Sequence, residues 1–293
     1  MGIIKQVDRI RRGLRRPEVR LHPIRAISRR LSWRWHWRKS TEPIHIPNWW
    51  RNLKISLPHT SNASLLYYRT HSDPSLVWLL QTLLYPRMTF LDVGAHIGEF
   101  TLIGAQMVGS EGRAIAVEPL PPCAEAVRRN ATMNGMDQVR VYDGALCGYS
   151  GKIGFQSDSE RSFGWIAAQP RQVAFEAPCW TLDDFLPFAG IAKADVVKLD
   201  AGGNELAVLR GGVKTLGDGK VGTLIMKLYH PNITRERFGY GSDESIALLR
   251  EQGYQLKLVV REDVFPIQRR EDMNAHFDPL VYCHLLVATK CQL

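Results

Sequence analysis

Seven residues from Asp92 to Gly98 place an acid and two glycines between a short apolar run and a helical stretch. Small residues at a strand-to-helix turn let a ligand approach the backbone, and the amino end of a helix favours negative charge. Glu118 ends the next apolar run, where its carboxylate can accept both hydroxyls of a ribose. The joint spacing of Gly94, Gly98 and Glu118 therefore predicts a nucleoside site.

The turn also indicates which nucleoside to expect. A nicotinamide dinucleotide site asks for G-x-G-x-x-G, but His96 stands where the second glycine of that pattern belongs. An acid before the first glycine, the wider glycine spacing and Glu118 suit S-adenosylmethionine, which has no pyrophosphate. The alternative is that glycine occurs at any such turn and that Glu118 is only a surface carboxylate. The joint spacing disfavours that alternative.

If a site for this cofactor transfers a methyl group to an alcohol, the reaction needs alignment and a base for the hydroxyl proton. Asp200 is the first candidate, because it ends the fourth strand of the series, and its alternative is a helix cap or a partner of the cofactor loop. His96, Glu205 and His230 are further candidates. Lys227 could act as a base if it were buried, but it is expected to pair with Asp200, which would weaken Asp200 as a base.

These residues are carried by alternating β-rich and helical runs, typical of a parallel sheet covered on both faces. Strands are expected at 90–94, 113–117, 139–142, 194–200, 223–229, 254–260 and 281–289, and helices at 99–108, 122–133, 204–216 and 242–252. Two short strands, 152–156 and 173–177, lie in an excursion over 150–180. No helix separates the last two strands, so the last strand is predicted to be antiparallel.

The formal charge of +9 is concentrated in the first forty residues, which hold thirteen Lys and Arg against two acids. Residues 1–50 are therefore predicted to form a basic extension, and 51–293 the folded domain. Five of the eight tryptophans lie in this extension, and apolar residues recur along it at helical spacing: Ile3, Val7, Ile10, Leu14, then Leu21, Ile24, Ile27, Leu31, Trp35. This pattern suits an anionic membrane surface. A solvated arm and a nucleic-acid arm are the alternatives, and the slightly acidic remainder disfavours nucleic acid.

The distribution of charged residues, apolar residues and cysteines argues against a secreted, a membrane-spanning or a disulfide-rich protein. An Arg or Lys recurs every few positions from Lys5 to Arg38, so the apolar run of a secretory signal is lacking. No apolar stretch is long enough to span a membrane. Five widely spaced cysteines without C-x-x-C predict neither a disulfide framework nor a metal site. We expect a cytoplasmic protein, peripheral on the inner membrane face if the extension binds lipid.

The sequence resembles FkbM-type methyltransferases over about residues 65 to 290. The resemblance is carried by ordered segments: Phe90 to Ala95, Gly98 to Leu102, Ala116 to Pro119, Asn130, Asn134, Gly144 to Leu146, Thr181 to Asp184, Val197 to Asp200, Gly203, Glu205, Leu209 and Gly211. It implies a Rossmann-like class I methyltransferase fold of the α/β class, with a seven-stranded, mostly parallel sheet. It also implies O-methylation of a sugar, a glycolipid or polysaccharide unit, or a polyketide-like metabolite with S-adenosylmethionine.

The resemblance also implies roles for individual residues. Asp92, Gly94, Ala95 and Gly98 would form the cofactor loop, Glu118 would hold the ribose, and the segment from Asp143 through Ala145 to Leu146 would border the adenine. Three positions depart from the family pattern. His96 replaces the usual Asn, Gly202 replaces a Glu, and Lys227 replaces an acid. These departures motivate the alternative of a catalytically impaired protein that acts through its basic arm.

Overall fold

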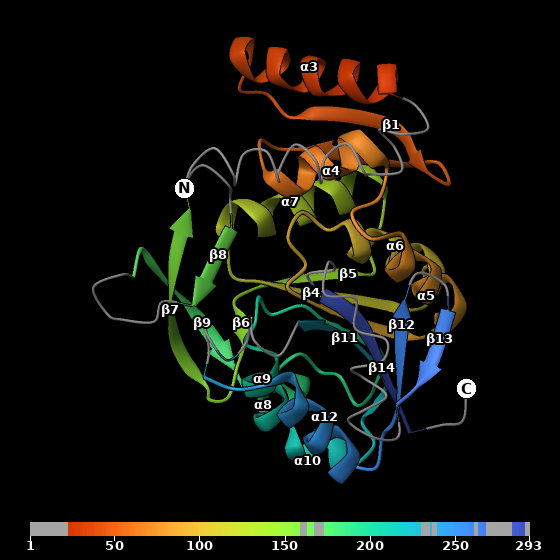
Figure 1. Ribbon diagram of the computed structural model, residues 1–293, viewed down its shortest axis with the longest axis vertical. Coiled ribbons are helices and arrows are strands. Elements are labelled where there is room, and N and C mark those ends of the chain that lie inside the picture. The colour runs from red at the N-terminus through yellow and green to blue at the C-terminus, as the bar shows by residue number, and fades with distance from the viewer. Residues whose placement is uncertain are drawn as a thin grey trace. The chain divides into compact units, whose positions relative to one another are not determined.

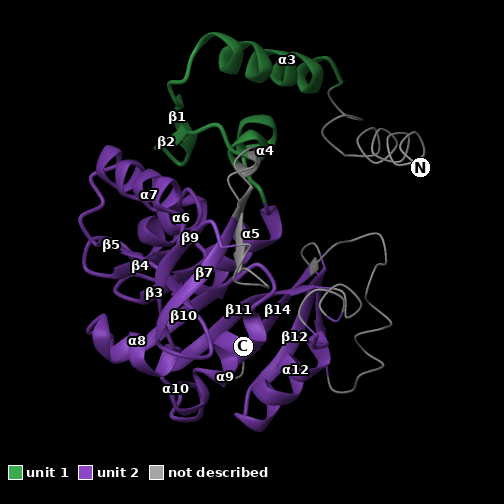
Figure 2. Ribbon diagram, turned by 90° about the vertical axis from the view of Figure 1, so that its left-hand side faces the viewer, with its two compact units in different colours: residues 1–72, 160–162 green, residues 73–159, 163–293 purple. Residues whose placement is uncertain are grey.

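The computed structural model describes residues 23–158, 163–166, 173–229, 235, 239–260, 263–267 and 283–290. The described chain forms two compact units that divide between Ser72 and Asp73, as Figure 2 shows. The apolar recurrence from Ile3 to Leu14, Leu21 and the candidate base His230 lie outside the described residues.

The larger unit contains the sheet that the sequence predicts. Its strands are ordered β13-β12-β14-β11-β10-β3-β4-β5. They comprise β3 (Thr89–Val93), β4 (Arg113–Glu118), β5 (Val139–Asp143), β10 (Ala194–Leu199), β11 (Val221–Tyr229), β12 (Gln255–Val260), β13 (Asp263–Pro266) and β14 (Cys283–Thr289). Neighbours from β5 to β11 pair in parallel, and β14 pairs antiparallel with both β11 and β12. The seven expected strands and the antiparallel last strand are confirmed.

The sheet has eight strands rather than seven because the chain turns back directly after β12. Val260 pairs with Asp263 and Lys257 with Pro266, so β13 forms an antiparallel hairpin with β12 at the sheet edge. The sequence analysis did not predict this strand. A proline can end such a strand at an edge, where no further ladder needs its missing N–H.

Helices cover both faces of the sheet, as Figure 1 shows, with α5, α6 and α7 on one side and α8, α9, α10 and α12 on the other. Their bounds are α5 (Pro74–Leu83), α6 (Glu99–Val108), α7 (Pro121–Met133), α8 (Leu182–Phe188), α9 (Glu205–Arg210), α10 (Val213–Gly217) and α12 (Ser242–Glu251). Strands covered on both faces read as continuous apolar runs. Four consecutive residues of β3, from Phe90 to Val93, are accordingly buried.

The helix expected over 204–216 is two helices, and that part of the prediction is wrong. Gly211 and Gly212 separate α9 from α10. A Cβ built on Gly211 would lie 2.4 Å from the carbonyl oxygen of Cys147, so the backbone approaches a neighbouring segment too closely for a side chain. That approach requires glycine there, and glycine is a poor helix former.

The excursion after β5 forms a small sheet of its own, ordered β6-β9-β7-β8. Its strands are β6 (Ala145–Leu146), β7 (Gly151–Asp158), β8 (Phe163–Ile166) and β9 (Phe175–Trp180). β7 and β9 match the two short strands expected there. The sheet has a separate cluster of buried side chains, in which the ring of Phe155 stacks on that of Phe175 at 5.4 Å.

The smaller unit contains α3 (Pro23–Lys39), the hairpin of β1 (Ile44–Trp50) and β2 (Leu53–Leu57), and α4 (Ser61–Arg69). The hairpin crosses residue 50, so the compact units do not divide where the sequence places the end of the extension. The division into 1–50 and 51–293 stays a prediction about independent domains. Trp33 and Trp49 are buried in this unit. These two rings pack inside the unit, and binding of the extension to a membrane surface stays a prediction.

Candidate functional site

The carboxyl ends of four neighbouring strands gather the predicted residues at one edge of the sheet. Register pairs Asp92 with Lys198, Val93 with Val117, and Leu199 with Met226. The residues that follow these pairs along β3, β4, β10 and β11 therefore lie side by side. We call this edge the carboxyl rim, and ligands of open α/β sheets bind at such an edge.

The turn after β3 is shaped by two glycines with positive φ. Gly94 has φ +74°, and a Cβ built on it would lie 2.0 Å from the carbonyl oxygen of Asp200. Gly98 has φ +87° and begins α6. His96 also adopts a left-handed φ of 52°, a region that Asn and His visit more readily than most residues. This turn, including the buried Ala95, is held against the end of β10.

Glu118 lies buried beneath this turn at the end of β4. One of its oxygens accepts the backbone N–H of His96 at 2.7 Å and the other that of Leu120 at 2.9 Å. Burial raises the pKa of Glu118 to about 7, against the lowering effect of those two hydrogen bonds. The alternative of a surface carboxylate is wrong. Each oxygen keeps a lone pair with which to accept a hydroxyl.

Asp92 is fully buried and acts below the turn rather than on its surface. Its Oδ2 accepts the Thr101 hydroxyl at 2.6 Å, and its Oδ1 lies 2.9 Å from Nζ of Lys198. Lys198 also donates to the carbonyl oxygen of Gly94 at 2.8 Å. The sequence analysis included Lys198 in the segment from Val197 to Asp200 but predicted no role for it. The available signal was a lysine inside an otherwise apolar run, a residue type that is rarely buried without a partner.

Asp200 stands at the centre of the carboxyl rim and is paired as expected. Its Oδ2 lies 2.5 Å from Nζ of Lys227, and its Oδ1 accepts the Tyr229 hydroxyl at 3.2 Å. Burial alone would raise the pKa of Asp200, but the charges of Lys227 and Lys198 and the two hydrogen bonds lower it below its ordinary value. Asp200 is therefore held as a carboxylate. Sequence reasoning did not find Tyr229.

Glu205 stabilises the backbone that follows Asp200. Its Oε1 accepts the N–H groups of Ala201 at 2.9 Å and Gly203 at 3.1 Å. Burial, and then the charge of Asp200, raise the pKa of Glu205 to about 7. The Tyr240 hydroxyl donates to the carbonyl oxygen of Gly203 on the same turn. These contacts position the turn, and the catalytic role given to Glu205 stays a prediction.

The segment expected to border the adenine lies beside Glu118. Asp143 pairs with Glu118 in register, and the N–H of Gly144 donates to the Glu118 carbonyl oxygen at 3.2 Å. Asp143 is exposed and forms an ion pair with Arg128 at 2.5 Å. Ala145 opens β6 next to it. The turn at 94–98 and the segment at 143–145 thus flank the end of β4, where the adenosine of the cofactor is predicted to bind.

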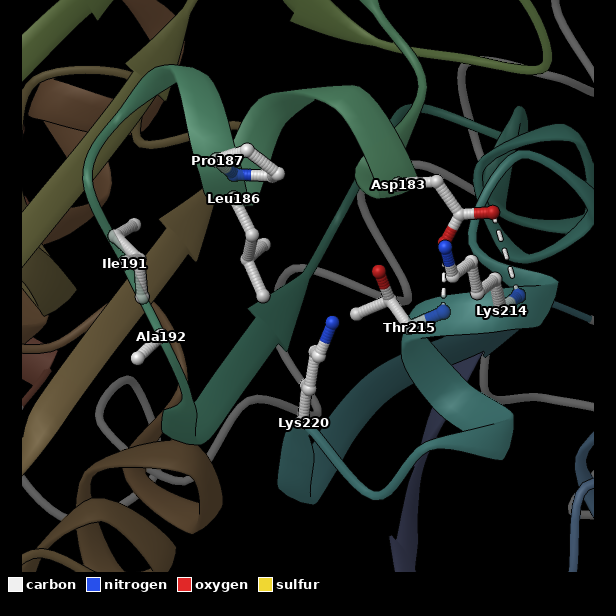
Figure 3. Close-up of a pocket in the computed structure, with 8 residues that line it drawn as sticks. All are labelled: Asp183, Leu186, Pro187, Ile191, Ala192, Lys214, Thr215 and Lys220. Carbon is white, nitrogen blue, oxygen red and sulfur yellow. Dashed lines mark hydrogen bonds between the residues drawn. The ribbon is translucent and has the colours of Figure 1, made fainter.

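A cavity of about 390 Å³ lies elsewhere in the larger unit, near the amino ends of β10 and β11. Figure 3 shows it lined by Asp183, Leu186, Pro187, Ile191, Ala192, Lys214, Thr215 and Lys220. The carboxylate of Asp183 accepts the backbone N–H groups of Lys214 and Thr215. Its position at the opposite strand ends separates this cavity from the carboxyl rim.

A family model described as the methyltransferase FkbM domain matches residues 92–256, more than half of the chain. The chain belongs to the FkbM methyltransferase family. The match begins at Asp92 and ends within β12, so it spans the residues gathered at the carboxyl rim. The resemblance stated from the motifs is confirmed, and so is the class I methyltransferase fold with S-adenosylmethionine as cofactor.

Individual relatives either match only part of the chain or have low sequence identity to it. A protein-L-isoaspartate O-methyltransferase of Triticum aestivum is 33% identical over 118 residues, which is 39% of this chain and 47% of that protein. The FkbM methyltransferase structure from Methylobacillus flagellatus is 16% identical, with a TM-score of 0.46, and the match covers 78% of this chain and 54% of that one. A Thermotoga maritima S-adenosylmethionine-dependent O-methyltransferase is 15% identical, with a TM-score of 0.44, covering 82% and 75%. The chain spans about half the length of the curated relative.

The carboxyl rim of this FkbM family member fits its cofactor. Glu118 offers lone pairs to a ribose diol, Gly94 and Gly98 keep the first turn free of side chains, and Asp143 and Ala145 flank the same strand end. Over the described residues, no helix has the length and apolarity that crossing a membrane requires.

Proposed function

We propose that the chain methylates a hydroxyl oxygen of a sugar, a glycolipid or polysaccharide unit, or a polyketide-like metabolite. Family membership supports the cofactor half of this proposal. The observation that carries the acceptor half is Asp200, an ionised carboxylate on the carboxyl rim between the cofactor turn and β11. A carboxylate placed there can receive the proton that an alcohol loses when it becomes an ether.

Bound S-adenosylmethionine supplies an electrophilic methyl group on a cationic sulfur. The chain itself has to bind the cofactor, orient the acceptor and remove the proton of the acceptor hydroxyl. Glu118 would hold the ribose hydroxyls, while Asp92 and Lys198 fix the turn from below, since Lys198 bonds both Asp92 and the Gly94 carbonyl. Fixed geometry of this kind supplies about 7 to 11 kcal/mol in oriented reactions.

Asp200 is oriented for a hydroxyl substrate by its two neighbours. Lys227 occupies one lone pair of Oδ2 and Tyr229 one lone pair of Oδ1, so each oxygen keeps a second lone pair for an acceptor hydroxyl. The pairing makes Asp200 a weaker base than a free carboxylate, because the charge of Lys227 favours the ionised form. Alignment of the acceptor therefore contributes more to the rate than proton abstraction does.

The test is transfer of label from methyl-labelled S-adenosylmethionine by the full chain to monosaccharides, lipid-linked glycans and polyketide alcohols. We expect a base-stable labelled ether, and a rate about 10² to 10⁴ lower in Asp200→Asn. The matched control is Asp218→Asn, an exposed acid paired with Lys220 at 3.5 Å, which should leave the rate unchanged.

Two outcomes would contradict the proposal. Tight cofactor binding without transfer to any acceptor would favour the alternative of an impaired protein acting through its basic arm. Base-labile label on protein carboxyl groups would show ester formation instead, which is the direction suggested by the name of the wheat relative.

A further inference from the structure

Helix α3 exposes a row of large apolar side chains. Ile24, Ile27, Leu31 and Trp35 are 83%, 55%, 59% and 61% exposed. Their spacing of three, four and four residues places them on one side of the helix. We call these four residues the apolar row. Side chains of this size gathered on one exposed face mark an interaction surface more often than single exposed residues do.

The opposite side of α3 is fixed within its own unit. Ala26 and Trp33 are buried there, and the Trp33 ring lies 5.4 Å from the Tyr67 ring of α4. Arg29 donates to the carbonyl oxygen of Tyr68 at 3.3 Å, and the Ser32 and Tyr67 hydroxyls are 3.0 Å apart. The helix is thus held by one face, and the apolar row on the other face is displayed as a consequence.

Positive charge surrounds the apolar row. The seventeen residues of α3 include six Arg and Lys and no Asp or Glu. Arg25, Arg34, Arg38 and Lys39 are exposed, and Nζ of Lys39 lies 4.6 Å from the centre of the Trp35 ring. An apolar row bordered by cations complements a bilayer surface, where acyl chains lie beneath anionic headgroups.

We infer that the apolar row and basic border of α3 form a docking face for an anionic bilayer surface. A second copy of the chain fits less well, because pairing two rows would bring their basic borders together without acids on either helix. Nucleic acid would use the charge but would leave the apolar row in water. A bilayer satisfies both features at once.

The experiment is sedimentation of the full chain with vesicles of phosphatidylcholine containing 30% phosphatidylglycerol, and with vesicles of phosphatidylcholine alone. We expect binding to the anionic vesicles that falls with salt, and at least tenfold weaker binding to the neutral ones. Arg34→Gln with Arg38→Gln should weaken binding about 30-fold, since each basic residue near the surface contributes about 1 kcal/mol. Arg129→Gln with Arg140→Gln, also exposed, is the matched control and should change binding less than twofold.

The apolar half of the inference is tested by Ile27→Gln with Leu31→Gln. Gln is a good helix former, and both positions are exposed, so thermal unfolding should be unchanged. We expect at least tenfold weaker vesicle binding. Val213→Gln with Tyr85→Gln, two exposed apolar residues of the larger unit, serves as the matched control.

Three results would overturn the inference. The first is equal binding to both kinds of vesicle, or binding that these α3 variants leave unchanged. The second is binding of a single-stranded RNA, but not of vesicles, that the Arg variant abolishes. The third is a dimer in sedimentation equilibrium that the Ile27 and Leu31 variant converts to a monomer without any vesicle binding.

Discussion

If Glu118 holds the ribose as proposed, cofactor binding should depend on pH near neutrality. Its pKa is raised to about 7, so the site exchanges a proton in the physiological range. Ribose hydroxyls donate to the carboxylate form, and a bound cation also favours it. Affinity for S-adenosylmethionine should therefore rise with pH, by up to about tenfold per unit below pH 7, and level off above pH 8.

Calorimetric titration between pH 5.5 and 8.5 measures this slope. Glu118→Gln should bind more weakly and without the slope, while Asp218→Asn, at an exposed acid away from the carboxyl rim, should retain it. A pH-independent affinity in the natural chain would show that Glu118 does not contact the cofactor.

Lys227 sets the proton affinity of Asp200. In Lys227→Gln, the raising effect of burial on the pKa of Asp200 would be opposed only by the charge of Lys198 and the hydrogen bond from Tyr229, so this pKa should rise. If Asp200 is the base, the acid limb of the kcat/KM profile for methyl transfer moves up by about 1 to 3 pH units. Lys227→Arg keeps the charge and should keep the limb in place. If the acid limb of the profile does not move in Lys227→Gln, Asp200 is not the base.

Sequence spacing could place Asp92, Glu118 and Asp200 at strand ends, because strand periodicity fixes where a run stops. It could not show that Asp92 is fully buried or that Lys198 joins it to the Gly94 carbonyl. Those contacts arise only when β3 and β10 lie side by side, although they are 105 residues apart at the Lys198 to Val93 contact. The pairing of Lys227 with Asp200 was predictable because both lie near the carboxyl ends of adjacent strands, one residue after the register pair of Leu199 and Met226.

The two turns on either side of Asp200 use glycine for different reasons. A Cβ on Gly94 would meet the Asp200 carbonyl oxygen at 2.0 Å, whereas a Cβ on Gly202, at φ +66°, would have no neighbour within 4 Å. Gly202→Ala should cost only the about 1 to 2 kcal/mol of a left-handed residue. Gly94→Ala should cost more and also weaken cofactor binding at least tenfold, because the turn must move.

Urea unfolding and titration with S-adenosylhomocysteine separate these effects. Equal losses of stability and affinity in both variants would contradict the close approach of Gly94 to β10. The same comparison bears on the Glu that the family carries at position 202, for which the chain has space but a strained φ.

Elements with a strong period were predictable, and those set by tertiary contact were not. The parallel strands and α6, α7 and α12 follow apolar runs that end at glycine, proline or polar residues. The break between α9 and α10 depends on the approach of Gly211 to Cys147, which no local pattern records. The edge strand β13 owes its existence to the hairpin with β12 rather than to its own four residues.

For the whole molecule, the charge division along the chain was readable from the sequence, whereas the compact units were not. Composition changes near residue 40, yet the hairpin from Ile44 to Leu57 and α4 fold with α3. Trp33 of α3 packs against Tyr67 and Tyr68 of α4 as well as against Trp37 of its own helix, and these contacts hold the two helices together. Periodicity predicted the apolar row of α3 correctly but not the buried face opposite it.

Stability of the whole chain should fall as pH rises from about 4.5 to about 7. Glu118 and Glu205 have native pKa values of about 7, above those of an unfolded chain, so the native state alone binds their protons in this window. Each contributes a slope of up to about 1.4 kcal/mol per pH unit. Asp200 acts in the opposite sense, since its lowered pKa stabilises the fold above about pH 4, and that contribution is lost as pH falls further.

Urea unfolding at several pH values measures this profile without added cofactor. Glu118→Gln with Glu205→Gln should flatten it between pH 4.5 and 7, because an amide does not titrate. The amide oxygen at position 205 can still accept both N–H groups that Oε1 of Glu205 accepts. At position 118 one of the two accepted N–H groups loses its partner, which lowers stability at every pH without restoring the slope. An unchanged slope in this double variant would mean that neither glutamate carries the raised pKa.

The central claim is that S-adenosylmethionine binds at the carboxyl rim, and the most direct measurement is ultraviolet crosslinking of the methyl-labelled cofactor to the full chain. Peptides from the digested protein then show which segments carry the label. If the cofactor binds at the carboxyl rim, the label will lie in residues 92–98, 118–120 or 143–146 and will be lost on competition with S-adenosylhomocysteine. Label confined to 183–192 and 214–220, which line the cavity of Figure 3, would contradict it.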